Sequence, residues 1–210
     1  MACSHAKTHY SPAEVQADIE YLREQMETYH PGRYRYTSKE EMNALFEEAK
    51  QVILDAGCGT GLAGKKLREK ASRLVGVDIS PKMLIKAEEK GIYDELVEME
   101  LGAFLRLEKS IYDVIVASDL FIYFGDLTSI IKDAADALSS NGKLIFSIES
   151  GVKGGTYALG AHGRYCHTLE YVLTCIEKVG LKAQKTQETC LRKEFGKEVN
   201  AFLIIATKAE

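Results

Sequence analysis

The sequence predicts an α/β protein with a doubly wound, mainly parallel sheet of seven strands and a C-terminal antiparallel hairpin. Short apolar runs alternate with amphipathic segments, an order typical of parallel strands joined by helices. The apolar run at 52–54 leads into Asp55 and then into Gly57, Gly59 and Gly61, which indicates a buried strand turning sharply into a helix. The last two predicted strands, near 181–191 and 199–208, are joined by a few residues around 195–197, so they must pair antiparallel.

Length and composition restrict the class of protein. The 210 residues fit one domain with a modest extension, and 46% hydrophobic with 28% charged residues is ordinary for a globular chain. A net charge of −4 argues against a nucleic-acid partner held by broad electrostatics. No apolar run approaches the ~20 residues of a membrane span, so no membrane partner is expected. Five cysteines without a Cys-x-x-Cys pair favour a reducing, cytoplasmic location.

The chain divides into three parts. Residues 1–10 are polar and are predicted to be a flexible tail. Residues 11–50 are predicted to be a helical cap, because Ser11-Pro12-Ala13-Glu14 and Ser38-Lys39-Glu40-Glu41 are capping boxes that each precede an amphipathic helix. The main domain is expected over 51–210.

Within the main domain, local signals predict each element in turn. The glycine turn leads into a helix from about Thr60 to 70, and the run at 74–78 is a second strand. Ser80-Pro81 begins a helix that ends at Gly91, and Thr168 caps another that ends at Gly180. Further strands are expected at about 95–101, 112–118, 143–148, 181–191 and 199–208, a helix at 127–138, and a glycine-rich loop at 151–163.

The glycine turn predicts a site for the negative end of a ligand. Glycine permits positive φ and close approach of a ligand to the main chain, and the N-terminus of the following helix attracts negative charge. A dinucleotide fingerprint has the order Gly-x-Gly-x-x-Gly, whereas Leu62 stands here at the place of its third glycine. This departure weighs against a nicotinamide-dependent oxidoreductase. Asp55, two residues before Gly57, favours a ligand that also carries an ammonium group.

Acidic residues follow the next strands at matching places. Asp78 lies 21 residues after Gly57, where an acid accepts the hydroxyls of a ribose; its alternative role is a helix-capping or loop acid. Glu100 is expected at the end of the third strand, where its carboxylate can accept a hydrogen bond from the amino group of adenine while the N–H of Leu101 donates to the ring. The alternative is that Glu100 is a surface acid. Asp119 ends the fourth strand, beside the crevice in which open α/β sheets bind ligands.

With these residues in place, the chain resembles a class I S-adenosylmethionine-dependent methyltransferase over about residues 51–208. The segments 93–96 (YDEL), 119–127 (DLFIYFGDL), 163–167 (GRYCH) and 190–194 (CLRKE) are similar to the predicted methyltransferases that are often fused to tetratricopeptide repeats. The resemblance implies S-adenosylmethionine as the cofactor.

The resemblance also implies a role for each matching position. The three glycines pass under the methionine part of the cofactor, Asp55 holds its ammonium, and Asp78 holds its ribose. Glu100 and Leu101 bind the adenine, while Ser118, Asp119 and Leu120 line the methyl-donor end. The full set of implied cofactor-binding residues is Asp55, Gly57, Cys58, Gly59, Thr60, Gly61, Asp78, Ile79, Met83, Glu100, Leu101, Ser118, Asp119 and Leu120. Cys58 within the turn is either a reactive thiol or a small residue that fits there.

The acceptor side is less specific. Methyl transfer from a sulfonium needs a nucleophile placed in line, within ~3–3.5 Å, and a base only where the acceptor must lose a proton. His162 and His167 are each either a general base or a hydrogen-bonded loop residue, so no catalytic residue is assigned. As a pair they could bind a metal, but no third ligand is evident, so no metal is assigned. Arg164 either pairs with an acidic substrate or makes a surface ion pair. The candidate substrate residues are Tyr123, His162, Arg164, Tyr165 and His167.

The sequence therefore predicts a methyltransferase that acts on an unidentified small-molecule acceptor by in-line transfer. The alternative is a non-catalytic, S-adenosylmethionine-binding module that regulates or accompanies another protein. The oligomeric state is not predicted.

Overall fold

A computed structural model describes residues 51–151, 155–160, 162–194 and 197–209. The tail predicted at 1–10 and the helical cap predicted at 11–50 lie outside the described residues.

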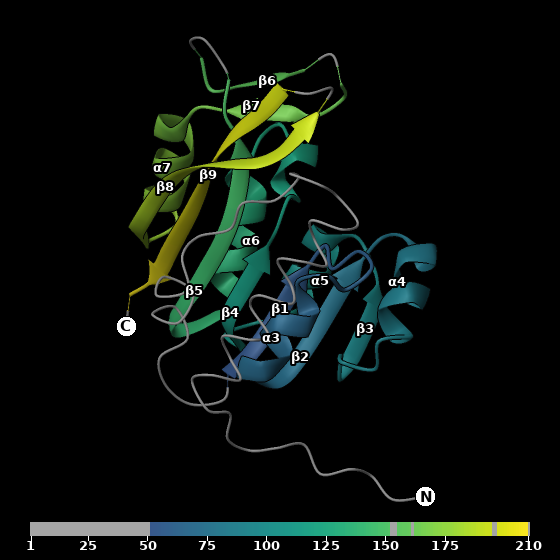
Figure 1. The fold of residues 1–210 in the computed structure, drawn as a ribbon. Coiled ribbons are helices and arrows are strands. Elements are labelled where there is room, and N and C mark those ends of the chain that lie inside the picture. Colours follow the sequence, from purple (N-terminus) through teal and green to yellow (C-terminus); the bar gives the residue numbers. More distant parts are fainter. Residues whose placement is uncertain (1–50, 152–154, 161, 195–196, 210) are drawn as a thin grey trace, which may run out of the picture.

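The described chain forms one nine-stranded sheet with a parallel centre (Figure 1). The parallel strands follow the order β3-β2-β1-β4-β5, and β9 pairs antiparallel with both β5 and β8. The short strands β6 and β7 form a hairpin that lies beyond the ends of β4 and β5, at the top of Figure 1. The strands are β1 (Gln51–Ala56), β2 (Ala71–Asp78), β3 (Glu95–Glu98), β4 (Tyr112–Ala117), β5 (Leu138–Glu149), β6 (Tyr157–Leu159), β7 (Tyr165–His167), β8 (Leu181–Glu194) and β9 (Lys197–Lys208).

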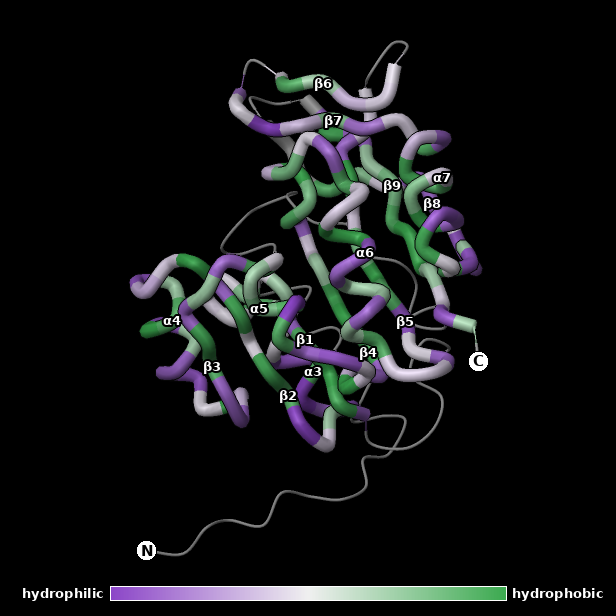
Figure 2. Tube along the Cα trace, turned by 180° about the vertical axis from the view of Figure 1, so that it is seen from behind, coloured by the Kyte–Doolittle hydropathy of each residue, from purple (hydrophilic) through white to green (hydrophobic). Residues whose placement is uncertain are grey.

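Helices cover both faces of this sheet, as a doubly wound fold requires. One face packs against α5, α6 and α7 in the larger core, and α6 crosses in front of β4 and β5 in Figure 2. The opposite face packs against α3 in a smaller core. The helices are α3 (Gly64–Lys70), α4 (Pro81–Glu88), α5 (Leu101–Leu107), α6 (Thr128–Ala137) and α7 (Leu169–Lys178), with a 3₁₀ turn η1 (Phe121–Tyr123). Among the described residues, none of the helices has the length and hydropathy needed to cross a bilayer.

Neighbouring residues of the central strands enter opposite cores. In β1, Ile53 and Leu54 are both fully buried, Ile53 in the smaller core and Leu54 in the larger one. Val114 and Ile115 of β4 divide in the same way. Successive strand side chains point to opposite faces, so a strand covered on both sides must be apolar at every position. This explains the continuous apolar runs and confirms the predicted doubly wound α/β class with its C-terminal antiparallel hairpin. The sheet has nine strands rather than the predicted seven, because β6 and β7 were not predicted.

Three regions differ most from the sequence-based expectation. Helix α3 begins at Gly64 rather than Thr60, because Gly61 has φ +77°, a conformation that a right-handed helix excludes. The strand expected over 95–101 ends at Glu98 and is followed by α5, which was not predicted. The loop expected over 151–163 is interrupted by β6, which begins the unpredicted β6–β7 hairpin. The predicted β8–β9 hairpin is confirmed.

Candidate active site

The carboxyl ends of β1, β2 and β4 bring the predicted site residues to one edge of the sheet. The loop after β1 is fixed to the end of β2, because the Gly59 N–H donates to Asp78 Oδ2 at 2.8 Å and the Cys58 N–H donates to the Val77 carbonyl at 3.0 Å. The other oxygen of Asp78 accepts from the Ser80 N–H at 2.8 Å. Asp78 therefore joins the glycine loop to the start of α4, and the structure supports its loop role directly.

The glycines shape this loop in different ways. The φ values are +66° at Gly57, +54° at Gly59 and +77° at Gly61, and residues other than glycine rarely adopt such values. A Cβ at Gly57 would lie 2.6 Å from Leu120 Cδ1, so this glycine lets the loop pack against the end of β4. Within the part of the chain that the structure describes, a Cβ at Gly59 would meet no atom within 4 Å. The backbone at Gly59 is thus open to an approaching ligand.

Asp55 is a buried carboxylate beside this loop. It is 2% exposed, and its Oδ2 accepts a hydrogen bond from the Tyr93 hydroxyl at 2.6 Å. Burial raises the pKa of Asp55 to about 6; the bond from Tyr93 opposes this rise and the nearby Asp78 adds to it. A bound cation would stabilise the ionised carboxylate. An ammonium group bound beside Asp55 would therefore favour loss of the proton from its carboxyl group.

Tyr93 is a site residue that the sequence analysis did not identify. Its ring fills the space that three glycines leave open: added Cβ atoms would lie 3.0 Å from Cε2 at Gly61, 2.1 Å from the hydroxyl oxygen at Gly64 and 2.9 Å from Cε1 at Gly76. Burial, with the charge of Asp55, raises the pKa of Tyr93, so its hydroxyl remains a proton donor. A signal for this packing was present in the sequence: Gly64 in α3 and Gly76 in β2 stand where no turn requires a glycine.

Cys58 is buried inside the loop. Burial raises the pKa of its thiol to about 12, and the charges of Asp55 and Asp78 add to the rise. The thiolate is the reactive form of cysteine. Cys58 is therefore a small neutral residue that fits the turn, as one of the two sequence-based alternatives states.

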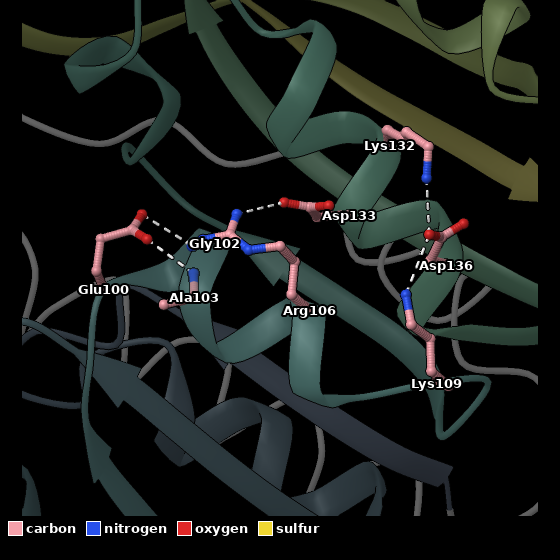
Figure 3. Close-up of polar contacts among 8 residues, drawn as sticks. All are labelled: Glu100, Gly102, Ala103, Arg106, Lys109, Lys132, Asp133 and Asp136. Atoms are coloured by element: carbon pink, nitrogen blue, oxygen red, sulfur yellow. Dashed lines mark hydrogen bonds and ion pairs between the residues drawn. The ribbon is translucent and has the colours of Figure 1, made fainter.

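Glu100 caps a helix instead of ending a strand. Its carboxylate accepts the N–H groups of Gly102 at 2.8 Å and Ala103 at 2.7 Å, in the first turn of α5 (Figure 3). These bonds satisfy N–H groups that have no partner within the helix. Leu101 is buried in the larger core. Neither sequence-based alternative for Glu100 included this capping role.

The chain turns sharply after β4. Asp119 has φ +53°, and its N–H donates to Ser147 Oγ of β5 at 3.0 Å. Leu120 follows against Gly57, and Ser118 precedes the turn. This geometry brings Leu120 next to the glycine loop, and the role of 118–120 at the methyl-donor end stays a prediction.

Exposed apolar side chains surround the loop. Leu62, Ile79 and Met83 are 46%, 71% and 43% exposed, while Thr60 is partly buried. Apolar contacts of this kind line most small-ligand sites. Ile79 and Met83 are thus accessible, as expected of cofactor-binding residues.

The candidate substrate residues separate into two groups. Tyr123 is 62% exposed, whereas His167 is 1% exposed, stacks on Tyr171 and has its Nε2 2.9 Å from the Gly125 carbonyl. Burial lowers the pKa of His167 and keeps the ring neutral, so Nε2 is the donor to that carbonyl. His167 is therefore the hydrogen-bonded, packed residue of the two alternatives. His162, Arg164 and Tyr165 belong to the β6–β7 hairpin.

The sequence analysis considered His162 and His167 as a metal pair and assigned no metal to them. His162 lies instead 3.8 Å from Glu149, measured from Nε2 to Oε2, and near Cys166. Neither Glu149 nor Cys166 was predicted as a site residue. Their proximity depends on strand pairing between segments that are distant in sequence.

Comparisons with known proteins find similarity mainly to methyltransferases. Residues 54–146 match the family model described as a methyltransferase domain. An uncharacterized protein of Haemophilus influenzae is 36% identical over 105 residues, which cover 46% of this chain and 41% of that protein. A ubiquinone biosynthesis O-methyltransferase of Histophilus somni is 27% identical, covering 56% and 51%. An 18S rRNA (guanine-N(7))-methyltransferase of Bos taurus is 30% identical, covering 37% and 27%. The chain spans about half, or less, of the length of these relatives.

Solved structures share the fold. A SAM-dependent methyltransferase of Methanosarcina mazei has a TM-score of 0.67 at 18% identity, covering 83% of this chain and 99% of that one. Magnesium protoporphyrin IX methyltransferase of Synechocystis, solved with bound SAM, has a TM-score of 0.62 at 18% identity, covering 96% and 86%. The described chain thus has the fold of the class I methyltransferases, and residues 54–146 are similar to the methyltransferase domain family.

Proposed function

We propose that this protein transfers a methyl group from S-adenosylmethionine to a small-molecule acceptor by in-line displacement. The observation that carries the proposal is the joining of the open glycine loop to the end of β2 through Gly59 and Asp78, beside the buried Asp55. These groups suit a ligand that carries both an amino-acid end and a ribose.

The described residues fit the cofactor. The open backbone at Gly59 would accommodate its methionine part, and Asp55 would hold its ammonium. Each oxygen of Asp78 accepts one backbone N–H, and a carboxylate oxygen has capacity for a further bond, here from a ribose hydroxyl. Glu100 would bind the adenine amino group in the same way while it caps α5. Cys58, Thr60, Ile79 and Met83 complete the contact surface.

When bound, the cofactor supplies an electrophilic methyl carbon on a sulfonium. The contribution of the chain is then to orient it and to direct the acceptor to the opposite side of that carbon. Residues 118–120 border the methyl-donor end, with their turn held by Ser147. Tyr123, the exposed aromatic residue that follows, is proposed to contact the acceptor.

A small acceptor is favoured by the charge of the chain. A net charge of −4 disfavours a polyanionic partner, although one relative is named for an rRNA reaction. The name of the Histophilus somni relative supports a small acceptor. The finer similarity to methyltransferases fused to tetratricopeptide repeats remains part of this proposal and rests on the four segments quoted above.

Calorimetric titration with S-adenosylhomocysteine tests the cofactor. Binding is expected. Asp78→Asn should weaken it at least tenfold, because asparagine has a single acceptor oxygen, which cannot accept hydrogen bonds from a ribose hydroxyl and from both backbone N–H groups. Asp133→Asn is the control, since Asp133 forms an ion pair with Arg106 away from the loop (Figure 3). Failure of the folded protein to bind at millimolar concentration contradicts the proposal. Binding without turnover over a broad panel of acceptors would favour the non-catalytic alternative.

A further inference from the structure

We propose that Glu149, His162 and Cys166 form a binding site for a divalent transition-metal ion, with Zn²⁺ the best match. Their ligand atoms all lie within 4.8 Å of one another. Glu149 Oε2 lies 3.8 Å from His162 Nε2 and 3.9 Å from Cys166 Sγ. The proposal does not depend on methyl transfer.

Strand pairing fixes two of the three ligands. Glu149 is the last residue of β5, and its partner in the parallel pairing with β7 is Cys166. Ala201 of β9 pairs with Glu149 on one edge of β5, so β7 must use the other edge, which β4 occupies further back along the strand. The pair therefore lies beyond the carboxyl end of β4, on the side of the proposed acceptor.

The β6–β7 turn supplies the third ligand. Leu159 pairs with Tyr165, and the turn between them is closed by bonds from the Gly160 N–H to the Arg164 carbonyl and from the Gly163 N–H to the Gly160 carbonyl. A Cβ at Gly160 would lie 2.8 Å from Cε1 and Nε2 of His162. The glycine therefore makes room for the imidazole to lie back over the turn, toward Glu149.

The separations suit a tetrahedral ion. Zinc bonds of about 2.0–2.3 Å to oxygen, nitrogen and sulfur place tetrahedral ligands about 3.4–3.6 Å apart. The separations of 3.8 and 3.9 Å from Glu149 exceed this by only a few tenths of an ångström, and the third separation is within 4.8 Å. A mixed set of thiolate, imidazole and carboxylate favours zinc over calcium or magnesium, which prefer oxygen ligands alone.

Burial defines the character of the site. The side chain of Glu149 is 2% exposed, that of His162 is 38% exposed, and Cys166 is partly buried. The site thus has a buried carboxylate at its base and a solvent-facing imidazole. Three protein ligands leave a fourth position for water or another small ligand, as in catalytic rather than structural zinc sites.

Cobalt substitution tests the site without an activity assay. The full chain, stripped by a chelator, is titrated with Co²⁺; we expect one ion per chain, a thiolate-to-cobalt charge-transfer band and visible bands typical of four ligands. Zn²⁺ should displace the cobalt and remove these bands. Folded protein that shows no such band contradicts the proposal.

Variants identify the ligands. Cys166→Ser should abolish the charge-transfer band, and His162→Ala should weaken Co²⁺ binding at least tenfold while retaining the fold, because His162 is solvent-facing. Cys190→Ser and Cys3→Ser are matched thiol controls and should retain the band. A band that survives Cys166→Ser, or is lost in Cys3→Ser, contradicts the proposed site. S-adenosylhomocysteine binding by the metal-free protein, measured in parallel, separates this result from the proposed function.

Discussion

Asp55 combines burial, a hydrogen bond from Tyr93 and the proximity of a second carboxylate, Asp78, in a single side chain. Desolvation favours its neutral form, whereas an ammonium group favours its charged form. The proposed binding of the cofactor is therefore linked to the loss of a proton from Asp55.

This linkage predicts that affinity for S-adenosylhomocysteine depends on pH. With a pKa of about 6, Asp55 is mostly ionised at pH 7 and mostly protonated at pH 5. Since only the ionised form pairs with an ammonium, the affinity should fall about tenfold between these pH values and level off above pH 7. Calorimetry across this range measures the effect. Asp55→Asn should bind weakly at every pH, and a wild-type affinity that is constant with pH would contradict the assignment.

Tyr93 is predicted to act as a positioning residue for Asp55. Tyr93→Phe keeps the ring that fills the space at Gly64 and Gly76 but removes the hydroxyl that donates to Asp55. That bond lowers the pKa of Asp55, so the variant should shift the midpoint of the pH profile upward. Tyr112→Phe is the matched control, because Tyr112 is a buried tyrosine of β4 in the larger core. A loss of stability without a shift of the midpoint would mean that Tyr93 has a packing role alone.

Residues close to one another in sequence were predictable, and distant partners were not. The glycine loop and Asp78 follow from local patterns, because a strand, its turn and its next strand end are ordered along the chain. The contact of Tyr93 with Asp55 joins residues that are 38 positions apart. It depends on how α4 and β3 return the chain to β1, which no local pattern contains.

Helix α5 depends on its first turn. Glu100 caps it (Figure 3), and Phe104 and Leu105 anchor it in the larger core. Arg106 and Lys109 form ion pairs with α6, but both cations are 58% exposed, and pairs of this kind contribute little. The stability of this helix therefore comes from the cap and the buried face.

Substitution of Glu100 separates capping from cofactor binding. Glu100→Ala should cost about 1 kcal/mol in the free energy of unfolding, and Glu100→Ser should restore most of it, because serine is a good N-cap. Urea unfolding measures this. Serine is too short to reach an adenine as well, so the affinity for S-adenosylhomocysteine should remain reduced in both variants. Full recovery of affinity in Glu100→Ser would restrict Glu100 to capping.

At the level of elements, length determined what could be predicted. The apolar runs of β1, β4 and β9 predicted these strands. By contrast, α5 has only seven residues, and β6 and β7 have three each. Such short elements have too few residues to show a period. The hairpin is held by its turn and by pairing with β5, so the Glu149, His162 and Cys166 cluster could not be foreseen.

The whole sheet is expected to respond to the cofactor, because the site joins loops from three strands. At a ligand concentration of 100 times Kd, the unfolding free energy should rise by about 2.7 kcal/mol, which raises Tm by about 5–11 °C for a chain of this size. Thermal unfolding with S-adenosylhomocysteine measures the shift. NADH at the same concentration should leave Tm unchanged, and an equal shift with NADH would revive the dinucleotide alternative.

The sheet order was predictable as a class but not in detail. Alternating strands and helices predicted a parallel, doubly wound centre, and the short final connection predicted an antiparallel pair. Which strand of that pair contacts β5 was not predicted, although the two differ: β9 contains the apolar run 201–206, as a strand with neighbours on both edges does, whereas β8 is mostly polar.

The position of β9 between β5 and β8 has a consequence for the order in which the sheet is completed during synthesis. β5 ends at Glu149, but its partner residues in β9 extend to Thr207, about 60 residues later. At a synthesis rate of ~5–20 residues per second, this edge of β5 therefore remains unpaired for about 3–12 s. During that interval a nascent chain exposes an unpaired strand edge, the kind of surface that recruits chaperones or a second copy of the same segment.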